Sequence, residues 1–124
     1  MSYVWLNEAS KLFLQRDYLL PGQALDERVD IICSHAEKIL KKPGFGTKFK
    51  RNIMRGWYSL ATPIWANFGE PGRGLGISCY SSYIPDTMAG ILYTMAEIGA
   101  MSAVGGGTAA YFGKIRHRGS SIKN

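Results

Sequence analysis

Cys79 is the side chain of this sequence best suited to chemistry, because a thiol can be oxidised and then reduced again by exchange. It lies in a short apolar run, residues 75–80, directly after a glycine-rich turn. Thr62 precedes it, and residues 105–108 (GGGT) and Arg116 follow it. Loops of this kind can present backbone amides and cations to the phosphate groups of a ligand. A thiol set among such loops indicates redox chemistry on a nucleotide.

Three helices are expected ahead of these loops, and the second has the clearest pattern. They are expected at residues 4–15, 24–40 and 46–58. In the second, apolar side chains recur at spacings of three and four, as on one face of a helix. Pro43 and Gly44 are expected to end it, and Asn7 or Ser2 is expected to cap the first helix.

The second half of the chain has a different character, because residues 59–74 are rich in glycine and proline and are expected to be extended chain and loop. A strand at residues 75–81, a helix from Asp86 to about Met101 and a strand at residues 108–112 are expected after it. Asp86 is a good N-cap. The apolar residues of this helix nearly encircle it, which implies burial on more than one side. Three helices before a strand–helix–strand unit predict the start of an α/β sheet or barrel.

The charge of the chain is +6, from 15 basic and 9 acidic residues, and it does not by itself distinguish nucleic acid, membrane or free nucleotide as a partner. No known nucleic-acid-binding motif accompanies it. The longest apolar stretch, residues 91–104, is too short and too polar to span a bilayer. The first residues lack the pattern of a signal peptide. A cytoplasmic protein without membrane contact is expected.

The two cysteines, Cys33 and Cys79, are not expected to form a disulfide in a cytosolic chain. Cys33 lies on or beside an apolar helix face and is expected to be a packing residue. With two histidines and no Cys-x-x-Cys motif, the sequence predicts no metal site.

Three runs of the sequence resemble one family in the order and spacing of their motifs. They are residues 57–63 (WYSLATP), 73–80 (RGLGISCY) and 105–119 (GGGTAAYFGKIRHRG). Together they resemble the large (alpha) subunit of class I ribonucleotide reductase, and residues 5–20 are similar to the segment ahead of its catalytic barrel. The resemblance implies a helical pre-barrel segment at residues 1–58. It implies the start of a ten-stranded α/β barrel at residues 59–124, incomplete on its own.

The resemblance also implies a mechanism for the reduction of ribonucleoside diphosphates to deoxyribonucleotides. In this family a cysteine thiyl radical abstracts the 3′ hydrogen, and two further cysteines reduce the 2′ carbon and become a disulfide. Cys79 matches the first thiol of that pair, Ser78 matches a residue that lines the sugar, and Thr62 matches one near the substrate phosphates. The radical cysteine and the second thiol of the pair are expected beyond Asn124, so the chain alone is expected to be inactive.

A second set of residues, Asp86, Arg116 and Lys123, matches the specificity effector site of the family, which binds ATP or a deoxynucleoside triphosphate. Asp86 stands where a carboxylate accepts from the sugar hydroxyl, Arg116 where an arginine reaches the phosphates, and Lys123 where a second cation is often found. The helix at residues 86–101 is similar to one that packs against its copy in a homodimer. From the residues alone, Asp86 could equally be a plain N-cap, and Arg116 and Lys123 could belong to a solvated basic tail.

The partners that the resemblance implies lie outside this chain. They are the remaining C-terminal part of the large subunit, a metal-containing small subunit that generates the radical, and a thioredoxin or glutaredoxin-type reductant. The chain itself is expected to bind no metal or other resident cofactor, and to lack the ATP-cone that precedes the barrel in many relatives. The alternative function is a non-catalytic nucleotide- or nucleic-acid-binding module that uses the basic C-terminal loop.

Overall fold

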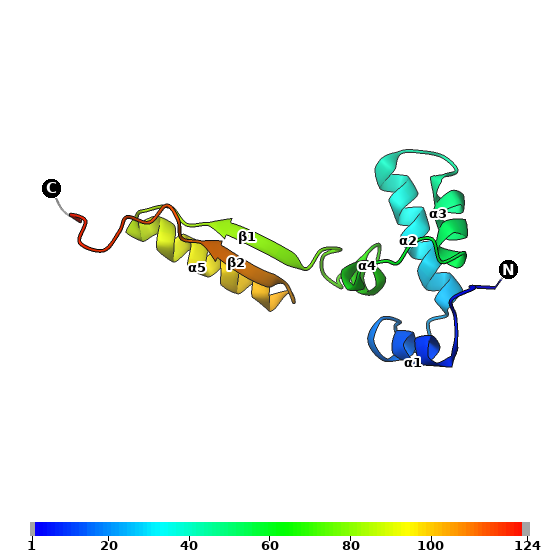
Figure 1. Ribbon diagram of the computed structural model, residues 1–124. Coiled ribbons are helices and arrows are strands. Elements are labelled where there is room, and N and C mark those ends of the chain that lie inside the picture. The colour runs from blue at the N-terminus through cyan, green and yellow to red at the C-terminus, as the bar shows by residue number, and fades with distance from the viewer. Residues whose placement is uncertain (1, 123–124) are drawn as a thin grey trace. The chain divides into compact units, whose positions relative to one another are not determined.

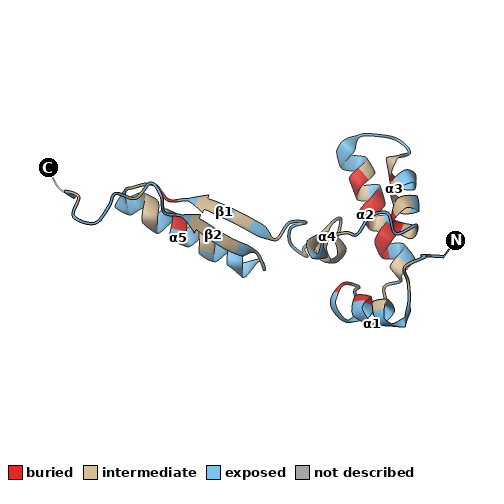
Figure 2. Cartoon of the chain, viewed as in Figure 1, coloured by how far each residue is buried: buried red, intermediate tan, exposed pale blue. Residues whose placement is uncertain are grey.

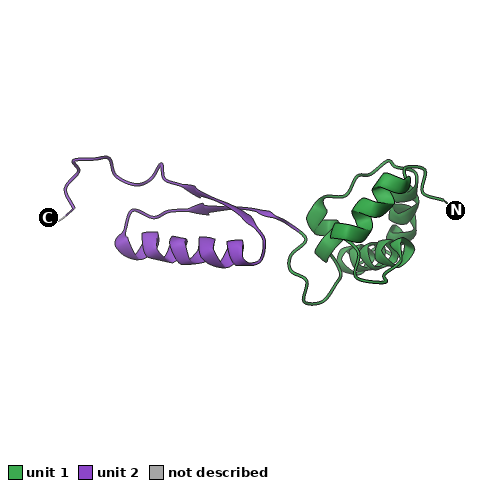
Figure 3. Ribbon diagram, turned by 90° about the horizontal axis from the view of Figure 1, so that it is seen from below, with its two compact units in different colours: residues 1–76 green, residues 77–124 purple. Residues whose placement is uncertain are grey.

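The computed structural model describes residues 2–122 of the chain. These residues form two compact units that meet between Gly76 and Ile77 in the sequence (Figure 3). The first unit contains α1 (Glu8–Asp17), α2 (Leu25–Leu40), α3 (Phe45–Met54) and α4 (Thr62–Asn67), and the second contains β1 (Cys79–Tyr83), α5 (Met88–Ala103) and β2 (Gly107–Tyr111) (Figure 1). The sequence-based division between residues 58 and 59 separates proposed roles rather than compact units, and it stays a prediction.

Helix α1 begins directly after its capping residue, Asn7, and not at the first residue of its apolar pattern. Asn7 Oδ1 accepts from the backbone N–H of Ser10 at 2.9 Å, and the Ser10 hydroxyl accepts from the backbone N–H of Asn7 at 2.8 Å. This reciprocal pair is a capping box, so of the two predicted candidates, Asn7 and Ser2, Asn7 is the N-cap. The predicted start at residue 4 is wrong, because the N–H of Val4 instead donates to the carbonyl of Met54.

The core of the first unit is built on the apolar face of α2, where buried residues follow the predicted spacing (Figure 2). Val29 and Cys33 pack with Tyr3 and with Ile53 of α3. The helix ends as predicted near residue 40, but Lys41 takes the left-handed conformation, with φ of 52°. Pro43 and Gly44 lie just after this residue, and the helix stops before them.

Helices α2 and α3 approach closely at Gly46. A Cβ atom at this position would lie 2.9 Å from the backbone oxygen of Cys33, so the contact requires glycine. The Gly46 N–H donates to Glu37 Oε2 at 2.7 Å, which satisfies one of the free amides at the start of α3. The helix ends at Met54, four residues before its predicted end.

Residues 62–67 form the short helix α4, so the prediction of extended chain and loop over residues 59–74 is wrong there. The mistake came from reading Pro63 as a helix breaker. Proline is favoured in the first turn of a helix, where its missing N–H has no partner in any case. The carbonyl groups at the other end of α4 have side-chain partners that the local sequence does not show.

In the second unit, β1 and β2 pair in parallel with Cys79 opposite Gly107, and α5 runs along one face of the pair (Figure 1). The strands alternate between exposed and half-buried residues, so their other face is open. The predicted first strand, residues 75–81, is wrong at its start, because the carbonyl of Leu75 accepts from Asn67 Nδ2 instead of joining a sheet. The predicted order of strand, helix and strand is confirmed, as is an incomplete α/β arrangement.

Thr87 caps α5 through its side-chain oxygen, which accepts from the Gly90 N–H at 3.0 Å, so the prediction of Asp86 as the N-cap is wrong. Thr94 is the buried residue of this helix, whereas Met88, Leu92 and Tyr93 are exposed. The expected burial of its outer side stays a prediction that concerns a partner. Among residues 2–122, no helix has both the length and the apolar character needed to cross a membrane.

Candidate functional site

Cys79 is the first residue of β1, and its thiol is free and exposed. Its Sγ lies 4.0 Å from the Ser78 hydroxyl oxygen. The Ser78 carbonyl accepts from the backbone N–H of Gly107 at 2.6 Å, and Cys79 stands opposite Gly107 in the sheet. The structure therefore brings the predicted thiol and the predicted glycine-rich loop together, at the start of two neighbouring parallel strands.

The glycines of this loop have a packing role that the sequence analysis did not assign. A Cβ atom at Gly106 would lie 2.3 Å from the ring of Tyr80, so only glycine allows the ring to cover the loop in this way. The Tyr80 hydroxyl donates to the carbonyl of Ile77 at 3.0 Å. The Tyr80 side chain thus contacts both the glycine-rich loop and the residue two positions before Cys79.

Cys33, the other cysteine, has the opposite environment. It is 3% exposed in the core of the first unit. Burial, with a smaller contribution from Asp30 that outweighs the opposing effect of Lys50, raises the pKa of its thiol to about 11. It is a free thiol, as Cys79 is, so its expected packing role fits the structure and no disulfide joins the two. Of the two cysteines in the sequence, only Cys79 is accessible to a substrate or a reductant.

Thr62, the predicted phosphate contact, is the first residue of α4 in the first unit, whereas Ser78 and Cys79 belong to the second. Its side chain contacts Tyr18, which lies in the connection between α1 and α2. The hydroxyl oxygens of Thr62 and Tyr18 lie 3.1 Å apart, within hydrogen-bonding distance. Tyr18 is itself buried.

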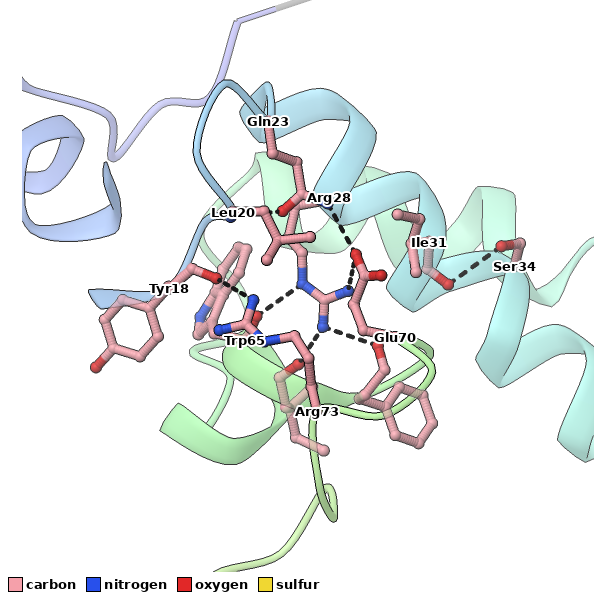
Figure 4. A network of polar contacts seen from close by, with 11 residues as sticks. Tyr18, Leu20, Gln23, Arg28, Ile31, Ser34, Trp65, Glu70 and Arg73 are labelled. Atoms are coloured by element: carbon pink, nitrogen blue, oxygen red, sulfur yellow. Dashed lines mark hydrogen bonds and ion pairs between the residues drawn. The ribbon is translucent and has the colours of Figure 1, made fainter. Parts of the chain in front are cut away.

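Arg28 of α2 is the most heavily bonded side chain of this region, and the sequence analysis missed it (Figure 4). It is fully buried, at 0% exposure. Its Nε donates to the carbonyl of Trp65 at 2.7 Å, and its Nη2 donates to those of Ile64 at 3.0 Å and Phe68 at 2.8 Å. Its Nη1 lies 3.3 Å from Glu70 Oε1. One guanidinium thus binds the carbonyl groups at the end of α4 and a carboxylate in the loop that follows it.

The charge of Arg28 is compensated within the same cluster. Burial lowers the pKa of Arg28, and the Glu70 carboxylate works against that change. Glu70 Oε1 also accepts from Gln23 Nε2 at 2.8 Å. A sequence signal existed, because Arg28 lies on the apolar face of α2 between Leu25 and Ile32, where a charge needs buried partners.

Asp86 and Arg116, the two predicted effector contacts within the described residues, are in direct contact. Arg116 Nε donates to Asp86 Oδ2 at 2.8 Å, and Arg116 Nη2 donates to the Asp86 carbonyl at 3.3 Å. Arg116 Nη1 also donates to the carbonyl of Ser121 at 2.8 Å. Arg116 thus joins the basic C-terminal loop to the start of α5. Lys123, the third predicted contact, lies outside the described residues.

Over residues 2–122, no group of three or more His, Cys, Asp or Glu side chains lies close enough together to hold a metal ion. The polar groups of the second unit instead pair with one another. Ser82 of β1 donates to Glu97 of α5 at 2.7 Å, and the buried Thr94 hydroxyl donates to the carbonyls of Tyr83 and Gly90. These bonds fix α5 on the sheet.

Comparisons with known proteins agree with the motifs. A family model described as "Ribonucleotide reductase, barrel domain" matches residues 77–124. The chain is 34% identical over 83 residues to a putative ribonucleoside-diphosphate reductase large subunit of Frog virus 3 (isolate Goorha), which covers 67% of this chain and 14% of that protein. It is 49% identical over 51 residues to the ribonucleoside-diphosphate reductase large subunit of Invertebrate iridescent virus 6, which covers 41% of this chain and 5% of that protein.

A solved structure is similar along nearly the whole chain. It is the Actinobacillus ureae class Id ribonucleotide reductase alpha subunit, with 54% identity and a TM-score of 0.89. The match covers 99% of this chain and 24% of that one, so the chain spans about a quarter of the length of this relative and less of the curated ones. These findings do not favour the alternative of a non-catalytic binding module. The chain belongs to the ribonucleotide reductase large-subunit family.

Proposed function

We propose that this chain supplies the first reducing thiol, part of the substrate site and part of the effector site of a ribonucleoside-diphosphate reductase. The observation that carries the proposal is the position of Cys79. It is an exposed thiol at the start of β1, beside the glycine-rich loop before β2, within the segment that the barrel-domain family matches.

The proposed role of Cys79 is to donate electrons as one half of a dithiol. The C2′–O bond of the ribose breaks, a C2′–H bond forms, and the hydroxyl leaves as water. The dithiol loses two electrons and two protons and becomes a disulfide, which an external dithiol reduces by exchange. Because Cys33 is buried in the core of the first unit, the second thiol must come from outside this chain.

The remaining substrate contacts follow from the resemblance and fit their surroundings. Ser78 lies directly beside Cys79, where its hydroxyl or backbone lines the sugar in the proposed complex. Thr62 is an exposed residue, and its hydroxyl, 3.1 Å from that of Tyr18, is proposed to contact the phosphates. The substrate class is ribonucleoside diphosphates, and the radical that starts the reaction comes from a metal-containing small subunit.

The effector contacts are proposed to be Asp86, Arg116 and Lys123, with ATP or a deoxynucleoside triphosphate as the ligand. The contact between Asp86 and Arg116 supports this assignment, because it brings a carboxylate and a guanidinium from distant parts of the sequence to one place. A carboxylate has more acceptor positions than one arginine uses, so Asp86 can also accept from a sugar hydroxyl. Arg116 can grip phosphate with its fork of donors, whereas Lys123 would act as a point charge.

The proposed assembly contains the remaining part of the large subunit, the small subunit and a second copy of the large subunit. The exposed apolar residues of α5 are proposed to pack in the homodimer. The reductant is proposed to be a thioredoxin or glutaredoxin-type protein, and the compartment is proposed to be the cytoplasm.

Reconstitution tests this proposal. We expect no deoxyribonucleotide from the purified 124-residue chain, and turnover when the remaining part of the large subunit, the small subunit and a dithiol are added. Cys79→Ser should abolish sustained turnover, whereas Cys33→Ala, a matched change at the buried cysteine, should retain it. Sustained turnover by the Cys79→Ser protein would refute the proposal. Loss of function on charge reversal at Arg116 and Lys123 combined with a silent Cys79→Ser would favour the binding-module alternative.

A further inference from the structure

Helix α4 carries Thr62 but has only six residues, from Thr62 to Asn67. A helix this short is not stable in water without tertiary contacts, because its few hydrogen bonds do not offset the cost of forming the first turn. Its position must therefore be set by the side chains that hold its two ends. Both ends are held from elsewhere in the first unit.

Arg28 holds the carbonyl end. Its guanidinium donates to the carbonyls of Ile64, Trp65 and Phe68 where α4 stops, and the Ile64 carbonyl also accepts from the Phe68 N–H (Figure 4). Its positive charge also lies at the negative end of the helix dipole. The planar fork of arginine fits several acceptors at fixed angles, which the single ammonium group of lysine cannot reproduce.

Tyr18 holds the other end. Its backbone N–H donates to the carbonyl of Leu14 in the last turn of α1, and its ring packs against Phe13. Its hydroxyl lies 3.1 Å from the Thr62 hydroxyl. The Tyr18 carbonyl accepts from Arg73 Nη1 at 3.4 Å, which connects this end of α4 to the loop after Glu70. The Thr62 side chain is thus fixed by a buried ring rather than left to rotate.

We propose that Arg28 and Tyr18 are positioning residues that hold α4 at its two ends and so set the Thr62 hydroxyl for the phosphate groups of a nucleoside diphosphate. This inference rests on the proposed role of Thr62 as a substrate contact. Neither residue touches the substrate in this account. Arg28 acts through the backbone of α4, and Tyr18 acts through one hydrogen bond.

The test is steady-state kinetics of the reductase that contains this chain, with Arg28→Lys and Tyr18→Phe. We expect Arg28→Lys to raise KM for the ribonucleoside diphosphate about tenfold and Tyr18→Phe about threefold, which is the scale of one displaced or lost hydrogen bond. In both variants kcat should stay within about twofold of the parent, because the reducing thiol is untouched. The effector concentration for half-maximal response should not change. Arg16→Lys is the matched control, because Arg16 is exposed and pairs with Asp17 away from α4.

Two further results separate this proposal from the proposed function. Thr62→Val should raise KM at least as much as Arg28→Lys does. If Thr62→Val raises KM while Arg28→Lys and Tyr18→Phe leave it unchanged, the positioning role is wrong and the role of Thr62 stands. An unchanged KM in Thr62→Val refutes the substrate role of Thr62 and the positioning proposal with it.

A purely structural role for Arg28 has its own signature. Partial unfolding lowers the fraction of active enzyme, which lowers kcat at constant KM. That pattern in Arg28→Lys, together with an unchanged KM in Tyr18→Phe, would overturn the proposal. Tyr18→Phe removes only a hydroxyl and keeps the ring, so it tests the proposal even where the Arg28 variant does not fold.

Discussion

The two compact units differ in how far each one completes its own core. In the first unit, α2 buries an apolar face against α3 and the N-terminal segment, and even a buried arginine has a full set of partners. In the second, Ile84 and Thr94 are the buried residues among those described. One face of its two-stranded sheet and the outer side of α5 are exposed.

This difference indicates that the open sheet and the outer side of α5 are the places where further protein of the family fold would pack. A two-stranded parallel sheet with free edges is a marginal structure, and the edges of such a sheet are completed by further strands or are covered. The exposed apolar side chains of α5 are likewise typical of an interface. The first unit has a buried core of its own, although it also exposes large apolar side chains such as Leu12 and Trp57. The second carries the thiol and the proposed effector contacts on an open sheet with little buried core.

The largest expected effect is a loss of stability caused by a change in the core of the first unit. Ile53→Ala removes a side chain that is 1% exposed, so it should lower the free energy of unfolding by about 2–5 kcal/mol. Denaturation followed by tryptophan fluorescence measures this, because all three tryptophans, at positions 5, 57 and 65, belong to the first unit. Leu92→Ala, at an exposed position of α5, is the control and should change the same transition by less than about 0.5 kcal/mol. Equal effects of the two changes would contradict the comparison.

The second prediction concerns alkaline pH. Because burial raises the pKa of Cys33 from 9.0 to about 11, the folded chain keeps this proton at a pH where the unfolded chain has lost it. The resulting stability is fully present below about pH 9 and is lost as the pH rises through about 11, at a cost of about 2–3 kcal/mol. Tyr3, whose pKa is raised mainly by burial and also by its bond to Asp26, acts in the same direction.

Urea denaturation of the first unit between pH 8 and 11 measures this loss. In Cys33→Ala the free energy of unfolding should fall less with rising pH, because the contribution of the thiol is removed. Tyr3→Phe should likewise remove the contribution of the phenol. A pH profile that neither variant alters would show that these buried groups do not titrate with unfolding.

The third prediction concerns two glycines of the second unit. Gly106→Ala places a Cβ atom against the Tyr80 ring, so it should lower the stability of the assembled large subunit by about 1–3 kcal/mol. Gly99→Ala, in α5, meets no atom within 4 Å and should be neutral or stabilising, by up to about 1 kcal/mol, through helix propensity. Thermal unfolding of the assembled subunit measures both. A destabilising Gly99→Ala would indicate that a partner approaches α5 at this position.

The smallest expected effect on stability comes from the contact between Asp86 and Arg116. Both side chains are partly exposed, so Arg116→Gln should lower the free energy of unfolding by less than about 1 kcal/mol. The same variant should weaken triphosphate effector binding at least tenfold, measured by isothermal titration calorimetry of the assembled subunit. Arg118→Gln is the matched control on the same loop. A large loss of stability with normal effector binding would make Arg116 a structural residue.

Sequence reasoning predicted the elements that depend on local signals. The apolar periodicity of α2, a cap at Asn7 and the order of β1, α5 and β2 all follow from residues that are close together in the sequence. The family resemblance, rather than the residues alone, singled out Asp86 and Arg116, which the structure brings together although they are far apart in the sequence.

Several of the features that it missed depend on contacts between distant segments. Helix α4 exists because Arg28 accommodates its carbonyl end from another helix, and no residue within 62–67 shows this. The first strand begins at Cys79 rather than at residue 75 because Asn67 binds the carbonyl of Leu75. The N-cap of α5 is Thr87, whose side chain accepts from the Gly90 N–H, while Asp86 pairs with Arg116. The start of β1 and the carbonyl end of α4 thus depend on tertiary contacts, whereas Pro63 and Thr87 were local signals that were misread.

The central claim, that Cys79 is the redox-active thiol and Cys33 a structural one, is tested most directly by differential alkylation and mass spectrometry. The reductase that contains this chain is allowed one turnover of a ribonucleoside diphosphate without external reductant, and free thiols are then alkylated after unfolding. The account predicts that Cys79 is protected, in a disulfide with a cysteine outside residues 1–124, while Cys33 is fully alkylated. Full alkylation of Cys79 after turnover, or a disulfide that includes Cys33, would contradict it.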